Sequence, residues 1–185
     1  SRTLRKSSTA SSAAADGVGA RKIGIIGGPE EISTAQERLQ GYRSAYEKEN
    51  LPVRESLIYH GDYTIQGGVR GIEKLVADNP DMTAVFVTNY EMTMGAVIGM
   101  NELDLKIPEQ LSMIGFDNLQ FARACSPKLT IVAQPTSGIA REVAGIMLKR
   151  LEEAESEETE PITEKLGAEI IMGKSVRVLK EKENS

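Results

Sequence analysis

Short apolar segments alternate with amphipathic segments along most of this chain, and this alternation restricts the fold more than any other feature. The predicted strands are Lys22–Ile26, Glu55–Tyr59, Thr83–Thr88, Leu111–Phe116, Leu129–Ala133 and Ile170–Leu179. Strands that alternate with helices form βαβ units, whose right-handed crossovers place helices on both faces of a sheet. The sequence therefore predicts an α/β fold with a mostly parallel sheet.

The segments between these strands have helical periodicity. In the first, apolar side chains recur on one face from Ala35 to Tyr46. Its start, Ser33–Gln36, has the pattern of a capping box, so we expect the Ser33 hydroxyl to cap the helix and Gln36 to reach back. The other predicted helices pass through Val69, Ile72 and Val76 to stop near Pro80, and cover Glu91–Leu103 and Ser137–Glu152.

Composition disfavours several classes of protein. The chain has 185 residues and a formal net charge of −5, which argues against a basic nucleic-acid-binding surface on this chain itself. Cys125 is the only cysteine, so no internal disulfide can form. No apolar run approaches the roughly 20 residues needed to span a bilayer, and Ser1–Ala15 lacks the apolar core of a signal peptide.

Polar residues follow the predicted strands at the points where they end. Asn89 follows one strand, Asp117 the next and Gln134 a third, while Tyr63 comes just after the strand that ends at Tyr59. In open α/β sheets, ligands bind outside the carboxyl ends of the strands. The sequence therefore predicts a site for a small polar molecule at that edge.

A series of motifs resembles a known family. The motifs are Gly24–Pro29, Ala35–Tyr42, Gly61–Thr64, Thr83–Val87 through Met92 and Gly95-Ala96, Ile107–Asn118, and Leu129-Thr130 with Gln134-Pro135. Their order and spacing resemble the effector-binding core of the LacI/GalR family of transcriptional regulators, from Lys22 to about Leu151. The resemblance implies a type I periplasmic-binding-protein-like lobe, which is a fragment of a two-lobed core.

The resemblance also implies a division of the chain. Residues 1–20 would be a flexible lead-in, and residues 21–134 would form the C-terminal lobe. Residues 135–156 would be a helix of the N-terminal lobe, and residues 157–185 a return strand and a polar tail. On this interpretation a helix-turn-helix domain and the first half of the N-terminal lobe are missing from the chain.

Five residues are predicted to bind the ligand. By resemblance Arg38 contacts the effector, where its guanidinium can fork onto hydroxyls or a carboxylate. Tyr63 is expected to stack on the ligand ring. Asn89 can donate to and accept from hydroxyls, and Asp117 can accept from vicinal hydroxyls or a ring N–H. Gln134, at the expected hinge, would either touch the ligand or tie the lobes together.

Other motifs have weaker chemical meaning. Tyr90 departs from the family pattern, which has Asp directly after the Asn at this position. This departure predicts either an unusual ligand or a site with degenerate hydrogen bonding. Gly27-Gly28 lacks the spacing of a phosphate-binding loop. His60 is expected at the surface, and Cys125 as a structural thiol. We expect no catalytic residue, no metal and no cofactor.

The leading hypothesis is a sensor rather than an enzyme. A small effector, expected to be a carbohydrate with a purine as the alternative, would bind between two lobes of a cytoplasmic regulator. The protein would form a homodimer through the helix Glu91–Leu103 and the loop Phe121–Pro127. It would reach operator DNA only through the missing N-terminal domain, and it would not contact a membrane.

Three alternatives remain open at this point. A solute-binding receptor of an ABC transporter shares the fold, and a signal peptide upstream would favour it. An enzyme that acts on sugars or nucleotides would use the carboxylates of Asp62 and Asp117. Some members of the family respond to a protein partner instead of a small molecule.

Overall fold

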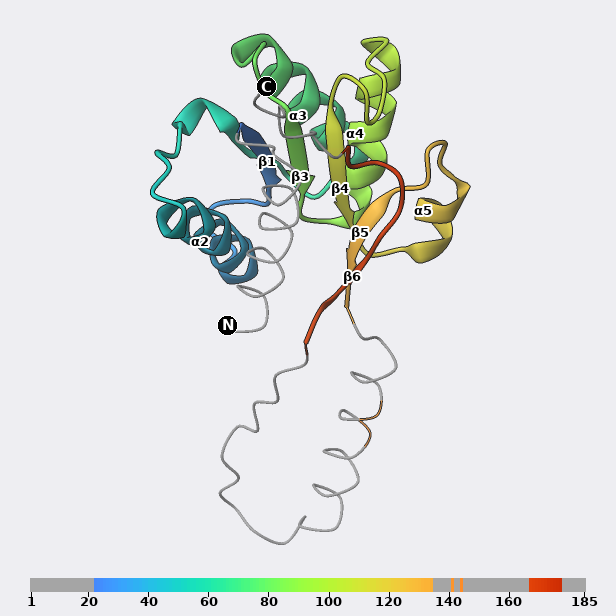
Figure 1. The fold of residues 1–185 in the computed structure, drawn as a ribbon. Coiled ribbons are helices and arrows are strands. Elements are labelled where there is room, and N and C mark those ends of the chain that lie inside the picture. Colours follow the sequence, from blue (N-terminus) through green and yellow to red (C-terminus); the bar gives the residue numbers. More distant parts are fainter. Residues whose placement is uncertain (1–21, 135–140, 142–143, 145–166, 178–185) are drawn as a thin grey trace, which may run out of the picture.

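The computed structural model describes residues 22–134, 141, 144 and 167–177, and these residues form one six-stranded sheet with helices on both sides (Figure 1). The strands are β1 (Ile23–Gly27), β2 (Ile58–His60), β3 (Ala84–Val87), β4 (Ser112–Phe116), β5 (Thr130–Ala133) and β6 (Glu169–Ile171). The helices are α2 (Ser33–Lys48), η1 (Glu55–Leu57), α3 (Ile65–Asp78), α4 (Tyr90–Glu102) and α5 (Leu119–Ala124). The predicted lead-in 1–20 lies outside the described residues, as does nearly all of the helix predicted over Ser137–Glu152.

The strand order is β2-β1-β3-β4-β5-β6. The pairs from β2 to β5 are parallel, and only β6 runs antiparallel to its neighbour β5. The predicted α/β class with a mostly parallel sheet is therefore confirmed. Since parallel strands end at the same edge, the residues that follow β1, β3, β4 and β5 are brought together there.

Each face of the sheet has its own apolar core. Alternate residues of a strand point to opposite faces, so Ile25 packs against α2, while its neighbour Ile26 packs on the other side. The α2 face includes Tyr42 and Tyr46, whose rings lie 5.0 Å apart. The opposite face is covered by α3, α4 and α5 and contains Met92, Met100 and Met113. The prediction of helices on both faces is thus confirmed.

The predicted capping of α2 is wrong. The capping residue of α2 is Ile32 and not Ser33, because the turn from Pro29 to Ile32 starts the helix one residue earlier. No side chain caps this end, and Gln36 donates instead to the Glu30 carbonyl at 2.7 Å.

The last strand is also shorter than predicted. It ends at Ile171, whereas the apolar pattern predicts a strand over Ile170–Leu179. Beyond it, bonds to hydroxyl groups alternate with single backbone bonds. The Gly173 N–H donates to Thr130 Oγ1 and the Thr130 N–H donates to Ser175 Oγ, while the Lys174 N–H donates to the Lys128 carbonyl. Side-chain hydrogen bonds of this kind leave no signal in the hydrophobic period.

Candidate effector site

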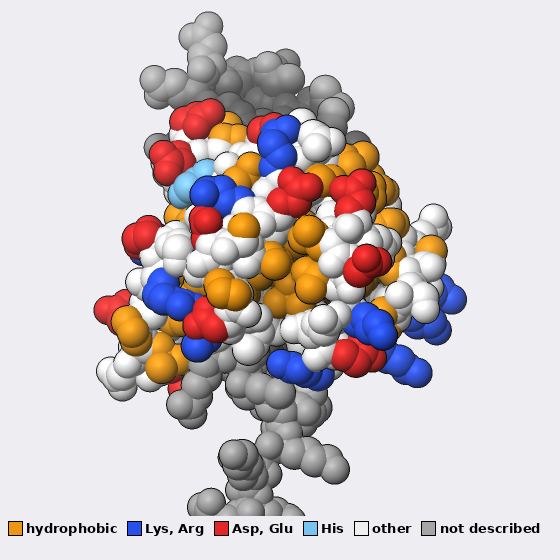
Figure 2. Space-filling model, turned by 90° about the horizontal axis from the view of Figure 1, so that it is seen from above, with side chains coloured by type: hydrophobic (Ala, Val, Ile, Leu, Met, Phe, Trp, Pro, Cys, Tyr) orange, Lys and Arg blue, Asp and Glu red, His pale blue; other side chains and the backbone are white. Residues whose placement is uncertain are grey.

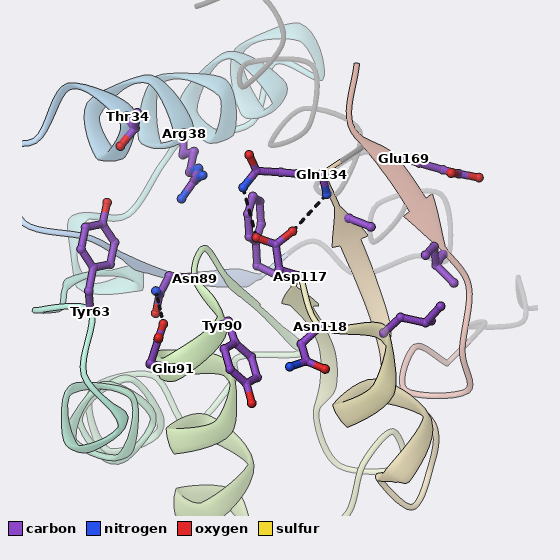
Figure 3. Close-up of a pocket in the computed structure, with 14 residues that line it drawn as sticks. Thr34, Arg38, Tyr63, Asn89, Tyr90, Glu91, Asp117, Asn118, Gln134 and Glu169 are labelled. Atoms are coloured by element: carbon purple, nitrogen blue, oxygen red, sulfur yellow. Dashed lines mark hydrogen bonds between the residues drawn. The ribbon is translucent and has the colours of Figure 1, made fainter. Parts of the chain in front are cut away.

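A cavity of about 850 Å³ lies at the carboxyl ends of β3, β4 and β5 (Figure 3). Its lining residues come from α2, from the segments after β2, β3 and β4, and from the ends of β5 and β6. They are Thr34, Arg38, Tyr63, Asn89, Tyr90, Glu91, Phe116, Asp117, Asn118, Leu119, Ala133, Gln134, Glu169 and Ile171. All five residues predicted to bind the ligand are therefore brought to one cavity, although their binding roles stay predictions.

Arg38 is the most buried charged residue of the site, with 9% of its surface exposed. Its Nη1 donates to the carbonyl of Thr88 at 2.7 Å, and its guanidinium carbon lies 4.2 Å from the centre of the Phe116 ring. Burial lowers the pKa of Arg38, and the neighbouring Tyr63 and Asp117 oppose that shift. The side chain stays charged at neutral pH because arginine does not deprotonate in proteins. Its Nε has no hydrogen-bond partner.

Asp117 lies across the cavity from Arg38, in the turn between β4 and α5. Asp117 and Asn118 both have left-handed backbone, with φ of 54° and 44°. Asp and Asn tolerate this conformation better than most residues, which explains why they occupy the turn. The Asn118 side chain accepts from the Phe121 N–H and caps α5.

The Asp117 carboxylate is bound to Gln134. One oxygen accepts from the Gln134 N–H at 3.0 Å, and the other accepts from the Gln134 side-chain amide at 3.1 Å (Figure 3). These bonds tie the end of β5 to the cavity floor, and the two roles predicted for Gln134, touching the ligand or tying the lobes together, both stay predictions. A carboxylate has further lone pairs, so this bonding leaves room for a ligand.

Asn89 has a structural role that its sequence position did not reveal. It is the capping residue of α4, where its side-chain oxygen accepts from the Met92 N–H at 2.8 Å. Its side-chain amide donates to Glu91 at 2.7 Å. The carboxylate absent at Tyr90 is thus supplied one residue later, by Glu91, and the Tyr90 ring packs edge-on against Phe121 at 6.0 Å.

Several lining residues were missed in the sequence. Phe116 forms the surface under Arg38, and Glu91, Leu119, Glu169 and Ile171 complete the walls. Phe116 directly precedes Asp117 in the Ile107–Asn118 motif, which is the one signal that could have marked it. Glu91 likewise lies in the motif that runs from Thr83 to Met92, whereas Glu169 and Ile171 lie outside every motif.

The structure does not bring the carboxylates of the enzyme hypothesis together. Asp62 does not line the cavity; it accepts from the N–H and hydroxyl of Thr64 and pairs with Arg70 at 2.9 Å. These contacts are those of a turn residue that caps locally. His60 is exposed and lies 3.1 Å from Glu30, as expected of a surface residue.

The sequence analysis expects no metal site and no membrane contact, and the described residues give one observation on each point. Over 22–134, 141, 144 and 167–177, no group of His, Cys, Asp or Glu side chains has the arrangement of a metal site. Within the same residues, none of the helices has the length and apolar character needed to cross a bilayer.

A parallel sheet with helices on both faces and a polar cavity at its carboxyl edge defines a lobe of the periplasmic-binding-protein type. A family model for the periplasmic binding protein-like domain matches residues 17–176. The chain is 35% identical over 147 residues to the HTH-type transcriptional repressor PurR of Klebsiella pneumoniae (strain 342), covering 77% of this chain and 43% of that protein. It is 37% identical over 134 residues to the HTH-type transcriptional repressor CytR of Escherichia coli (strain K12), covering 72% and 39%.

A comparison with solved structures also finds LacI-family regulators. A sugar-binding transcriptional regulator of the LacI family from Escherichia coli, crystallised with phosphate, superposes with a TM-score of 0.84 at 26% identity, covering 96% of this chain and 62% of that one. The chain belongs to the periplasmic binding protein-like family, as part of the effector-binding core of a LacI-family transcriptional regulator. It spans less than half the length of the curated relatives that it matches.

Proposed function

We propose that this chain is the effector-sensing region of a LacI-family repressor and that it binds a small, neutral, polar ring molecule in the cavity at the carboxyl edge of the sheet. A carbohydrate is the first expectation, and a purine is the alternative. One observation carries the proposal: a buried guanidinium, Arg38, and a carboxylate, Asp117, lie across one cavity, with the Phe116 ring between the guanidinium and the sheet.

The lining favours a neutral ligand over an anionic one. Arg38 is its only basic side chain among the described residues, whereas Glu91, Asp117 and Glu169 all carry carboxylates. A sugar hydroxyl can donate to a carboxylate and accept from a guanidinium, and so can the edge of a purine. The apolar surfaces of Phe116 and Tyr63 suit the flat face of either kind of ring.

The link between Asp117 and Gln134 suggests how binding would be coupled to movement. Gln134 directly follows β5, and its two bonds to Asp117 fix the end of that strand to the cavity floor. A ligand that touches Asp117 would change those bonds. It shifts the lobe arrangement only if it binds one arrangement better than the other.

The remaining partners follow from the family. We propose a cytoplasmic homodimer in which the segments Glu91–Leu103 and Phe121–Pro127 form the contact, since Ile98 and Leu103 are each more than 40% exposed although apolar. Operator DNA would be bound by an N-terminal helix-turn-helix domain outside this sequence. The repressors among the relatives favour a regulator over a transport receptor, and a non-enzymatic role over a catalytic one.

The proposal is tested by calorimetric titration of the chain with ribose, glucose, maltose, adenine and adenosine. The decisive variant is Asp117→Asn, because Asn keeps the side-chain shape and tolerates the left-handed backbone that Ala would strain. We expect at least one probe to bind and its affinity to fall by about tenfold or more in the variant, because hydrogen bonds to charged groups contribute about 1.5–3 kcal/mol.

The matched control is Asp78→Asn on the exposed side of α3, where the carboxylate pairs only with Lys74 at 2.8 Å. This variant should bind like the wild type. Equal affinity in Asp117→Asn and the wild type would contradict the site, and no binding by any probe would contradict the proposed ligand class.

A further inference from the structure

Two buried polar atoms at the cavity have no partner within the protein. Among the described residues, three buried side-chain nitrogen or oxygen atoms lack a hydrogen bond, and two of them, Arg38 Nε and Tyr63 Oη, belong to residues that line this cavity. In Figure 3 the hydroxyl end of Tyr63 points to the side of the cavity formed by Thr34 and Arg38. Because an unpaired buried polar group is unfavourable, this pair points to an acceptor supplied from outside the protein.

Two features fix the position of Tyr63, the turn in which its backbone lies and a contact at the far end of its ring. Its backbone has a φ of 61°, unusual for an aromatic residue, and the turn that holds it is fixed by the hydrogen bonds from Thr64 to Asp62. The far end of its ring lies against Gly28, the residue that follows β1. A Cβ at position 28 would overlap Cζ, Cε1 and Oη of Tyr63.

The contact at Gly28 involves only the end of a side chain. The three nearest atoms that a Cβ would meet all belong to the Tyr63 ring and hydroxyl. A methyl group there would therefore displace Tyr63 without preventing folding. This contact also gives a role to the Gly27-Gly28 pair, which has no phosphate-binding spacing.

We propose that Gly28 is a positioning residue that seats Tyr63, so that the Tyr63 hydroxyl and Arg38 Nε act together as hydrogen-bond donors to the effector. This inference rests on the proposed function and makes it more specific. Tyr63 would bind by its hydroxyl in addition to its ring face. The effector would carry acceptor atoms on the α2 side, and donors on the side of Asp117.

The positioning step is tested without any ligand, by NMR of the chain labelled with ¹³C at tyrosine Cζ. The Tyr63 resonance is assigned by its loss in Tyr63→Phe. We expect Gly28→Ala to shift this resonance while the free energy of unfolding stays close to that of the wild type. The matched control is Gly27→Ala, where the new Cβ would meet only the Tyr59 carbonyl oxygen at an ordinary 3.7 Å. An unchanged Tyr63 resonance in Gly28→Ala would overturn the positioning role.

The donor role is tested with whichever sugar or purine probe binds the wild type. Tyr63→Phe removes the hydroxyl and keeps the ring, and we expect it to weaken binding by about tenfold, with a similar loss in Gly28→Ala. In the ¹⁵N spectrum the Arg38 Nε–H resonance should move when the probe is added. Equal affinity in Tyr63→Phe would overturn the donor role while the proposed function stood, provided that Asp117→Asn still lost binding. If no probe bound at all, the proposed function would fail, and the Tyr63 resonance would still decide the role of Gly28.

Discussion

The two faces of the sheet are covered in different ways. On one face, α3 and α4 pack so closely that glycines are required where they meet: a Cβ at Gly95 would overlap the Ile65 carbonyl oxygen, and one at Gly68 would overlap the Met92 backbone. On the other face, α2 is held by large side chains with polar ends. Tyr42 donates to the Ile23 carbonyl at 2.7 Å, and the Ile23 N–H donates to Tyr46 at 2.8 Å.

This difference suggests that the two faces contribute differently, the α3–α4 face to stability and the α2 face to the proposed binding site. The α3–α4 face is sealed by backbone contact, and Ile72, Met92 and Met100 there are fully buried. On the α2 face, the tyrosines fix the C-terminal half of the helix to β1, while Arg38, one turn earlier, reaches the cavity. The first face therefore mainly holds the lobe together, and the second also holds Arg38 in place beside the cavity.

The view in Figure 2 shows the end of the molecule seen from above in Figure 1, away from the cavity. Apolar side chains lie at its centre, surrounded by charged groups. A hollow at the amino ends of β3 and β4 is lined by apolar and polar side chains, which are Val76, Asn79, Pro80, Met82, Leu105, Glu109, Gln110, Leu111 and Arg177. The two ends of the sheet thus differ as well, since the carboxyl end has the larger cavity.

The largest effect is expected on the α3–α4 face, from Gly95→Ala. Alanine favours helices over glycine by about 1 kcal/mol, but the new methyl group would overlap the Ile65 carbonyl oxygen and lie 2.8 Å from the Ile65 carbonyl carbon. Since backbone cannot move aside as a side chain can, we expect a net loss of about 3 kcal/mol in the free energy of unfolding, measured by urea denaturation.

The control for this change is Gly167→Ala, where a Cβ would meet nothing within 4 Å. It should alter the free energy of unfolding by less than about 0.5 kcal/mol. A Gly95→Ala variant as stable as the wild type would show that the helices are not in backbone contact and would remove the contrast between the faces.

A smaller effect is expected on the α2 face, from Tyr42→Phe. The change keeps the ring in the core but removes its hydrogen bond to the buried Ile23 carbonyl, and should cost about 1 kcal/mol of unfolding free energy. The same change at Tyr90, which contacts Phe121 through its ring, is the comparison and should cost less. Equal losses at both positions would argue against a special anchoring role for the Tyr42 hydroxyl.

The sequence predicts the fold better than it predicts the contacts of the site. The strand at Thr83–Thr88 and the helix at Glu91–Leu103 correspond to β3 and α4, because hydrophobic period is a local property. The prediction for the start of α2 was wrong because a preceding turn, and not the Ser33 hydroxyl, begins the helix. The prediction for the end of β6 was wrong because, beyond Ile171, bonds to side-chain hydroxyls interrupt the regular backbone pairing with β5.

The candidate site shows the same limit. Residues such as Asp117 and Gln134 could be placed together because parallel strands share a carboxyl edge. Spacing does not reveal that Asn89 is occupied by capping α4, or that Phe116 lies under Arg38. The contact of Phe116 with Arg38 depends on how a helix from one part of the chain packs over a strand from another, so it becomes visible only in three dimensions. The Asn89 cap is local, and an asparagine just before a predicted helix is the signal that could have marked it.

The smallest effect is expected at the rim of the α2 face, where Arg43 makes two bonds to Glu55 of η1, at 2.7 and 2.9 Å. The hydrogen bond from Arg43 lowers the pKa of Glu55 below its ordinary value of 4.5. A lowered folded-state pKa gives stability that is present above that value and is lost as the pH falls through the lowered pKa. Arg43 stays charged throughout this range.

Because 41% of the Arg43 side chain and 73% of the Glu55 side chain are exposed, solvent screening limits the coupling to about 0.5 kcal/mol at pH 7. A double-mutant cycle with Arg43→Ala and Glu55→Ala, followed by urea denaturation, should recover this value at pH 7 and almost none at pH 3 or in 1 M salt. A coupling of several kcal/mol that persisted in salt would mean that the ion pair, and not Tyr42 and Tyr46, anchors α2. The face that carries Arg38 would then be held from its rim rather than from its core.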